Sequence, residues 1–282
     1  MAIILPDNRE LRLNLFLKPT YAVIMPQIDR GKKGFSISQI QNRVNLKNNK
    51  HAGYLSKKSQ RKLVNTVNWL VASAKKKHVY SKLDRKKYVF RLNFVTLTLP
   101  TTNHNISDHY FKSVMLHAFI NACRYKFGLK NFVWKVEAQA NGNIHAHFTT
   151  DTFMHWKALR AVWNKILKSE GLIDDYTNKF SSMTEEHYIS YMRLLGYKNV
   201  DGLKSMYKKG VESGWCDPNS TDVKSVRKIK DIGAYLAKYM GKEDKERRAI
   251  KGRLWSSSYN LARANKTTVS IPVDYDYSFL HF

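Results

Sequence analysis

Two short segments of alternating apolar and polar residues flank the dipeptide Asn141-Gly142. Residues 132–139 and 144–150 show the period of two that is typical of β-strands. Asn-Gly between two such segments is one of the strongest short-range signals for a β-hairpin. The sequence therefore predicts two antiparallel strands joined by a tight loop.

The patterns around this hairpin indicate both strands and helices. A strand rich in Val and Thr is expected at about 91–99, where Pro100 stops it. Residues 1–55 read as irregular with short strands, and residues 196–222, with several glycines, read as a loop. Ser56 can cap a helix that reaches about Lys77. Further helices are expected at 107–127, 154–170, 184–195 and 225–242. This order predicts an α+β fold with an antiparallel sheet flanked by helices.

His145 and His147 are two residues apart on a predicted strand, so their side chains point to the same face. The length of the hairpin loop decides whether Glu137 joins them. A two-residue turn would point Glu137 to the opposite face. A three-residue loop of residues 141–143 pairs Glu137 with His147 and Gln139 with His145. We predict this loop, with a positive φ at its second or third residue.

One carboxylate and two imidazoles are a ligand set for a divalent cation. Glu137, His145 and His147 are the predicted ligands, and Gln139 shares their face. Mg²⁺ or Mn²⁺ fits a phosphodiester substrate, and the ligand types also admit Zn²⁺. The sequence therefore predicts a metal centre at this end of the hairpin.

Positive charge dominates the composition. The chain has 49 Lys and Arg against 22 Asp and Glu, and residues 1–90 hold 20 basic and only 4 acidic side chains. Such an excess favours a polyanionic partner, and nucleic acid fits better than an anionic membrane surface, because no basic stretch forms a clean amphipathic helix with bulky apolar anchors. The predicted DNA contacts are Arg30, Lys32, Lys33, Lys57, Lys58, Arg61, Lys62, Lys75, Lys76, Lys77, Arg247, Arg248 and Arg253.

A second cluster of reactive side chains occupies the last predicted helix. Tyr235, Tyr239 and Lys242 recur at i, i+4 and i+7 and so share one helical face, and each tyrosine has a lysine three residues later, Lys238 or Lys242. A phenol is a weak nucleophile at its ordinary pKa, but a nearby ammonium group or a metal-bound phosphate makes its attack feasible. Taken alone, the same pattern also suits an amphipathic helix with packed tyrosines and solvated lysines.

Three motifs in a fixed order carry a family resemblance. Phe94-Val95-Thr96-Leu97-Thr98, His145-Ala146-His147 and the segment Tyr235 to Lys242 follow one another. This order resembles the rolling-circle replication initiators, which are His-hydrophobe-His (HUH) endonucleases of small plasmids and single-stranded DNA phages. The doubled Tyr-x-x-Lys is similar to the two-tyrosine, microvirus-type initiators. Residues 252–258 resemble a stretch that follows the tyrosine motif in bacterial plasmid and phage initiators.

The resemblance implies a five-stranded antiparallel sheet flanked by helices and related to the RNA-recognition fold. It implies Glu137, His145 and His147 as ligands of Mg²⁺ or Mn²⁺. It also implies that Tyr235 or Tyr239 attacks a DNA phosphate, which leaves a 5′-phosphotyrosine and a free 3′-OH. The sequence fits both the one-tyrosine and the two-tyrosine templates, so both residues stay candidates, with Lys238 and Lys242 assisting at the phosphate.

The predicted organisation has three parts. Residues 1–90 form a basic DNA-binding extension, 91–245 the endonuclease domain, and 246–282 a tail that packs on it. The expected partners are single-stranded or stem-loop origin DNA and the helicase and polymerase of the host. The sequence indicates no oligomeric state. No apolar run approaches the roughly 20 residues that span a bilayer, so a cytoplasmic protein is expected, and the resemblance implies that the cell is a bacterial host.

Two other functions fit parts of these observations. A transposase or plasmid relaxase would use the same chemistry on different DNA. A non-enzymatic module would stack single-stranded nucleic acid on Phe94 and Trp134 of its sheet. The second alternative predicts neither a metal requirement nor a covalent adduct.

Overall fold

The computed structural model describes most of the chain. The described residues are 3–4, 10–19, 21–28, 36–38, 40–41, 53–100, 106–226, 235–236, 238, 240, 247–264 and 268–271. Three of the predicted DNA contacts, Arg30, Lys32 and Lys33, lie outside these residues.

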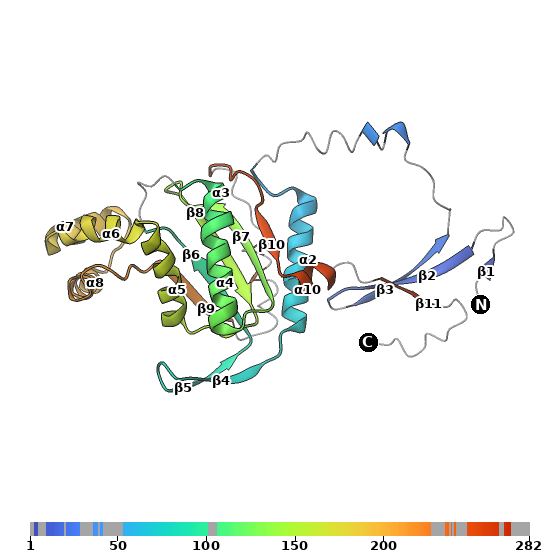
Figure 1. The fold of residues 1–282 in the computed structure, drawn as a ribbon, viewed down its shortest axis with the longest axis horizontal. Helices are drawn as coiled ribbons and strands as arrows, with labels where there is room; N and C mark the ends of the chain where they lie inside the picture. The colour runs from blue at the N-terminus through green and yellow to red at the C-terminus, as the bar shows by residue number, and fades with distance from the viewer. Residues whose placement is uncertain are drawn as a thin grey trace.

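A five-stranded antiparallel sheet forms the centre of the molecule, as predicted (Figure 1). Its strands lie in the order β10-β7-β8-β6-β9. Their bounds are β6 Leu92–Leu97, β7 Phe132–Ala138, β8 Ile144–Thr150, β9 Thr221–Val226 and β10 Trp255–Ser257. The fold is therefore α+β and consistent with an HUH or RNA-recognition architecture.

One face of this sheet is covered by helices that follow β6 and β8. These are α3 Asp108–Tyr110, the π-helical turn η1 Phe111–Met115, α4 Leu116–Phe127 and α5 Trp156–Ser169. Ser107 caps α3, since its side chain accepts a hydrogen bond from the Tyr110 N–H. The face supplies Val95, Ala146 and Phe148 to the main core. The alternation of β6 and β8 places these apolar residues here and sends Thr96, His145 and His147 to the other face.

The opposite face packs against α2 Lys57–Ser73 and, beside it, α10 Tyr259–Ala264. Ser56 caps α2 as predicted, and its side chain accepts from the Ser59 N–H. The helix ends at Ser73 rather than near Lys77, because the chain turns there into a strand. Its apolar stripe, with Leu63 and Val67 fully buried, packs on residues of β6 and β7. This second face also carries the predicted metal ligands.

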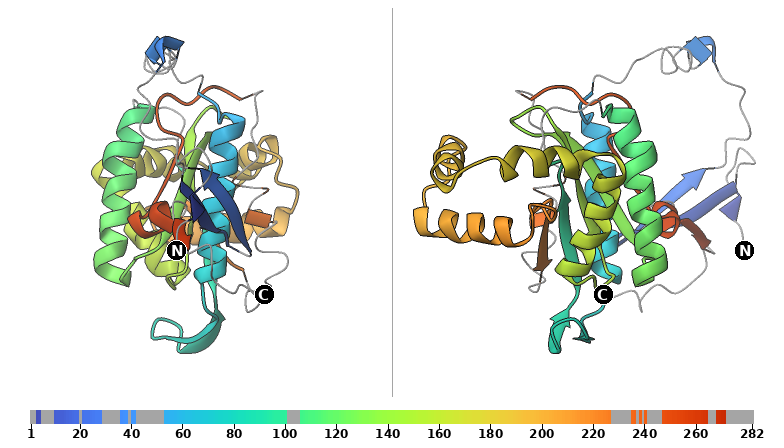
Figure 2. Two further views of the ribbon diagram at one scale, coloured as in Figure 1. Left: turned by 90° about the vertical axis from the view of Figure 1, so that its right-hand side faces the viewer. Right: turned by 60° about the vertical axis from the view of Figure 1, so that its left-hand side comes forward.

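Three further elements surround the sheet. A hairpin of β4 Lys77–Ser81 and β5 Lys86–Phe90 leads into β6, and in Figures 1 and 2 it projects from one end of the sheet. A helical unit of α6 Leu172–Ser181, α7 Glu185–Leu194 and α8 Val200–Glu212 has its own aromatic core. A separate sheet contains β1 Ile3–Ile4, β2 Glu10–Leu17, β3 Ala22–Ile28 and β11 Thr268–Ile271.

Two of the sequence predictions were wrong. The expected loop at 196–222 contains α8, because its glycines do not break the helix. Gly202 donates its N–H to the capping side chain of Asn199, and Gly210 lies against the ring of Trp215. The helix expected from residue 225 begins later, since Ser225 and Val226 belong to β9, where they pair with β6.

β9 and β10 lie at opposite edges of the five-stranded sheet. The segment that connects them, residues 227–254, includes the predicted tyrosine motif. Tyr235, Leu236, Lys238 and Met240 are helical, and Leu236 and Met240 are buried with Phe94 and Val133 on the second face. The chain therefore passes from one edge of the sheet to the other by way of the face that bears the histidines.

Candidate metal centre

The candidate metal centre lies on two adjacent inner strands of the sheet, β7 and β8. Glu137 on β7 lies directly opposite His145 on β8, and Lys135 lies opposite His147. The loop has three residues as predicted, but they are Ala140, Asn141 and Gly142 rather than residues 141–143. The predicted pairing of Glu137 with His147 and of Gln139 with His145 is therefore wrong, because each partner lies two residues earlier in the sequence. The prediction that Glu137, His145 and His147 share one face of the sheet is confirmed.

The conformation of Gly142 explains this register. Its φ is 83°, a left-handed value that glycine adopts without strain, as predicted for this loop. Its N–H donates to the Gln139 carbonyl at 3.0 Å, and the Gln139 N–H donates to the Asn143 carbonyl at 2.7 Å. Gly142 is thus the last residue of a β-turn over residues 139–142, and its left-handed conformation forms a bulge where β8 approaches. A turn followed by such a bulge is a common form of three-residue hairpin loop. Gln139 lies two pairs nearer the loop than Glu137, opposite Asn143.

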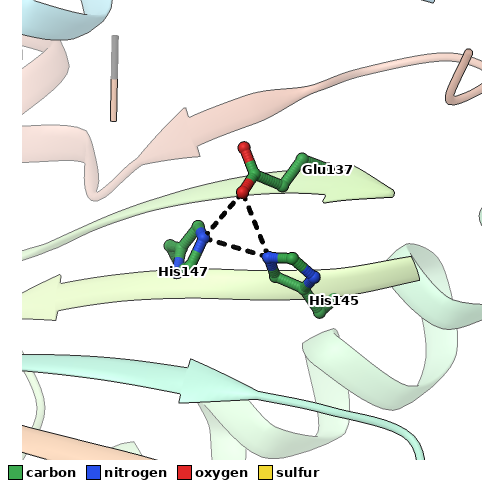
Figure 3. A group of neighbouring side chains, drawn as sticks. All are labelled: Glu137, His145 and His147. Atoms are coloured by element: carbon green, nitrogen blue, oxygen red, sulfur yellow. Dashed lines mark hydrogen bonds and ion pairs between the residues drawn. The ribbon is translucent and has the colours of Figure 1, made fainter. Parts of the chain in front are cut away.

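Three ligand atoms converge from these strands (Figure 3). Glu137 Oε1 lies 3.2 Å from His145 Nε2 and 3.0 Å from His147 Nε2, and the two Nε2 atoms are 3.0 Å apart. The two rings are buried, whereas 28% of the Glu137 side chain is exposed. Glu137, His145 and His147 together can hold a metal ion, with an approach from solvent on the Glu137 side.

The three atoms are close enough for one ion to contact all of them, with separations of 3.0, 3.0 and 3.2 Å. One carboxylate oxygen and two imidazole nitrogens form a donor set that divalent cations such as Mg²⁺, Mn²⁺ and Zn²⁺ accept. The residues therefore fit a divalent cation.

Neighbouring side chains hold the ligands in place. Thr96 Oγ1 lies 3.2 Å from His147 Nδ1, which leaves Nε2 of that ring for a metal. Phe94 stacks on His147, with its ring centre 5.3 Å from that of the imidazole and the two planes nearly parallel. Lys135 Nζ lies 2.8 Å from Glu137 Oε2, so the carboxylate oxygen that faces away from the histidines is also held.

These contacts also set the protonation states. Burial alone would raise the pKa of Glu137, but hydrogen bonds from His145 and His147 and the charge of Lys135 outweigh it and keep the pKa well below its ordinary value. Burial lowers the pKa of His145 against the attraction of Glu137. An ionised carboxylate beside a neutral imidazole is the state that binds a metal.

Lys135 is a site residue that the sequence reasoning missed. Only 3% of its surface is exposed, although it is a lysine. Buried lysines are rare unless they are paired. Its place two residues before Glu137 puts it on the same strand face, so strand parity was the signal that could have found it.

Of the predicted nucleophile cluster, the structure describes Tyr235 and Lys238. The Tyr235 ring meets the Phe94 ring edge-on at 6.0 Å, and Phe94 in turn stacks on His147. Tyr235 is half-buried and Lys238 is exposed. Tyr239 and Lys242 lie outside the described residues. Tyr235 and the predicted metal ligand His147 are far apart in the sequence. The fold places both beside the same ring, that of Phe94.

The predicted DNA contacts fall on separate surfaces. Lys57, Lys58, Arg61 and Lys62 of α2 line a groove of about 880 Å³ that Lys18 and Trp255 also border. Lys75, Lys76 and Arg253 are exposed.

Three of the predicted DNA contacts have partners inside the protein. Lys77 donates to the Asp151 carbonyl, Arg247 to the Ala138 carbonyl, and Arg248 pairs with the buried carboxylate of Asp108. Their role in DNA binding stays a prediction.

The alternative of a base-stacking sheet does not fit this geometry. Phe94 and Trp134 belong to different cores on opposite faces of the sheet, and 4% and 8% of their surfaces are exposed. They cannot form one open aromatic platform.

A comparison with protein families supports the resemblance seen in the motifs. Residues 92–244 match a family model of replication-associated proteins, described under the name ORF2. No curated protein and no solved structure matched the chain. In the described part of the chain, none of the helices has the length and apolar character that crossing a membrane requires.

Proposed function

The chain belongs to the ORF2 family of replication-associated proteins, and on that premise we propose that it is an HUH endonuclease of the bacterial plasmid or phage type. It nicks single-stranded origin DNA and starts rolling-circle replication. The observation that carries this proposal is the convergence of Glu137, His145 and His147 within reach of one ion, with Tyr235 nearby.

In the proposed reaction a tyrosine oxygen attacks a backbone phosphorus atom. The bond from phosphorus to the 3′-oxygen breaks, the tyrosine loses its phenolic proton, and the departing 3′-oxygen gains a proton. The products are a 5′-phosphotyrosine and a free 3′-OH, which a polymerase of the host can extend. Tyr235 and Tyr239 are both proposed nucleophiles, and Lys238 and Lys242 are proposed to contact the phosphate.

The other side chains prepare the site. His145 and His147 would bind Mg²⁺ or Mn²⁺ through their Nε2 atoms, and Glu137 through Oε1. The ion, when bound, supplies Lewis-acid polarisation of the scissile phosphate. Thr96 fixes the ring of His147, and Lys135 holds the free oxygen of Glu137. Phe94 positions the ring of His147, on which it stacks, and meets the ring of Tyr235 edge-on.

A covalent adduct is the decisive test. The protein is incubated with Mn²⁺ and a library of single-stranded oligonucleotides labelled at the 3′ end, and the mixture is run on a denaturing gel. Attack at phosphorus leaves the protein joined to the labelled 3′ fragment, so a labelled protein band is expected. Sequencing the DNA in that band gives the cleavage site.

The variants decide which residues act. Tyr235→Phe combined with Tyr239→Phe should abolish the labelled band, and EDTA should do the same while much of the DNA binding remains. Tyr125→Phe is the matched control, because Tyr125 is 97% exposed on α4, which packs on the other face of the sheet. A labelled band of equal intensity in the double variant would refute the tyrosine mechanism.

A further inference from the structure

The hairpin β4–β5 projects from the five-stranded sheet as a two-stranded ribbon (Figures 1 and 2). It lies at the end of the sheet where β6 begins. It also lies before residue 92, where the match to the replication-associated family starts. The ribbon is therefore a feature of this chain outside the matched family region.

One face of the ribbon is anchored to the protein. Phe90 packs edge-on against Phe153 at 5.3 Å, and Tyr88 lies 5.5 Å from the same ring. Asp84 in the turn accepts a hydrogen bond from Tyr88 and lies 3.2 Å from His155 Nε2, just before α5. These contacts hold the ribbon in one orientation.

The opposite face is exposed, and its cations are Lys87 of β5 together with Lys82 and Arg85 of the turn. The cross-strand pairs His78–Val89 and Tyr80–Lys87 point outward, and Lys82 and Arg85 in the turn are also exposed. Residues 75–91 contain eight Lys and Arg and a single acidic residue, Asp84, and of these cations Lys77 and Lys86 lie on the anchored face. Since Asp84 is held by Tyr88 and His155, no carboxylate within this segment neutralises the outer face.

The size and surface of the ribbon favour double-stranded DNA over a single strand as its partner. Two strands lie about 4.8 Å apart, and a two-stranded ribbon with its side chains fits the major groove of B-DNA, which is about 12 Å wide. The exposed face offers Lys87 and the turn residues Lys82 and Arg85 for phosphates, and Tyr80 lies opposite Lys87. It lacks the row of open aromatic rings on which single-stranded bases stack.

The position of the ribbon links it to the metal centre. Leu92, the first residue of β6, lies four residues before Thr96, which pairs with His147. Four residues of strand span about 13 Å, or about four base pairs of duplex. DNA held on the ribbon could therefore deliver a strand to the histidines after a few nucleotides.

From these observations we propose that the β4–β5 ribbon binds double-stranded DNA through its outer face, beside the single strand that is cut. This inference rests on the proposed function for its biological context, but the binding itself does not require cleavage. The ribbon holds the duplex part of the substrate, and the metal centre acts on the unpaired part.

The test compares two variants with equal loss of charge. The ribbon variant carries Lys82→Gln, Arg85→Asn and Lys87→Gln. Asparagine is chosen because Arg85 has a φ of 54°, which asparagine tolerates. The control variant carries Lys204→Gln, Lys208→Gln and Lys209→Gln, all exposed positions of α8. A third variant, Lys87→Glu, reverses one charge at a single exposed position.

The readout is binding to a fluorescent duplex of about two helical turns and to a single strand of the same length, over a series of salt concentrations. The ribbon variant should bind the duplex about 10- to 100-fold more weakly, with a salt slope lower by about 2–3, because about three phosphate contacts are lost. Lys87→Glu should change binding in the same direction. Single-strand binding and single-strand cleavage should stay within about twofold of the wild type, the variation expected when no phosphate contact is lost.

Three results would overturn the proposal: equal loss of duplex binding in the α8 control, loss of single-strand binding instead of duplex binding, or no loss at all. The outcome is independent of the nuclease assignment. If the wild type forms no covalent adduct but the two variants still differ in duplex binding, the ribbon proposal stands and the proposed function fails.

Discussion

Lys135 places a positive charge beside the proposed metal ligand Glu137. Its ammonium group contacts Glu137 Oε2 at 2.8 Å, and the side chain is almost fully buried. Two effects on a metal compete. The lysine orients the carboxylate, which favours binding, and it repels the cation, which opposes binding. At a few ångströms and an effective dielectric constant of about 20, the repulsion amounts to several kcal/mol, more than one hydrogen bond contributes.

Replacing Lys135 by Met should therefore strengthen Mn²⁺ binding, by about tenfold or more. Methionine keeps the length and packing of the side chain but carries no charge. The measurement is a Mn²⁺ titration followed by the shift in unfolding temperature. His145→Ala serves as the control that should lose the shift. Weaker Mn²⁺ binding in Lys135→Met would mean that orientation of Glu137 outweighs charge repulsion.

At the scale of elements, strand parity explains what the sequence could predict about the site. With a loop of three residues, the period of two in β7 and β8 puts Glu137, His145 and His147 on one face, whichever three residues form the loop. The register depends on where the left-handed residue lies in the loop. Gly142 takes that position as the third loop residue, so the partner of Glu137 is His145 and not His147.

Local sequence patterns did not predict three other features of the structure. The approach of Tyr235 to Phe94 depends on how residues 227–254 cross the sheet, which no short-range signal encodes. The β4–β5 ribbon was missed because lysines occupy both its faces, which hides the alternation. The helix α8 was missed because glycines such as Gly210 are typical of helix ends and loops. In the structure Gly210 lies inside the helix, where the lack of a side chain leaves room for the ring of Trp215.

Gly210 gives a test of that packing. A Cβ at this position would lie 2.3 Å from ring atoms of Trp215, which is 4% exposed in the core of α6–α8. An ordinary helical Gly→Ala change stabilises by up to about 1 kcal/mol. Here the clash should reverse the sign, and Gly210→Ala should destabilise by about 1–3 kcal/mol.

Thermal unfolding followed by far-ultraviolet circular dichroism measures this change, and the near-ultraviolet signal reports on Trp215. Ser205→Ala on the exposed side of the same helix is the control and should have little effect. A stabilised Gly210→Ala protein would show that the aromatic core can shift to make room.

At the scale of the whole molecule, residues 247–254 form hydrogen bonds to three segments that are far apart in the sequence. The Arg247 guanidinium donates to the Ala138 carbonyl, the Ile250 N–H to the Gly53 carbonyl, and the Lys251 N–H to the Asp108 carboxylate. Burial alone would raise the pKa of Asp108, but Arg248 and the Lys251 N–H outweigh it, so the pKa lies below its ordinary value of 3.8.

Asp108→Asn should lower the free energy of unfolding by about 1–2 kcal/mol at pH 7, since Arg248 is partly solvated and the pair is screened. Because the folded-state pKa is depressed, the contribution is fully present above pH 3.8 and is lost as the pH falls through the folded value. The difference from the wild type should therefore be constant from pH 5 to 8 and shrink in stronger acid.

Urea unfolding at pH 7, 5 and 3 measures the difference. Asp222→Asn is the control, because its pair with Lys224 is exposed on both sides. A difference that grows as the pH falls would rule out the carboxylate of Asp108 as its source.

The strands β9 and β10 fasten the tyrosine segment at both edges of the sheet. If Tyr235 carries a DNA end during the reaction, that end is attached to a chain with two fixed ends. It cannot diffuse away between cutting and rejoining, and its effective concentration at the metal centre is set by the length of the segment and not by dilution. Strand order in the sheet thus favours rejoining over loss of the cut end.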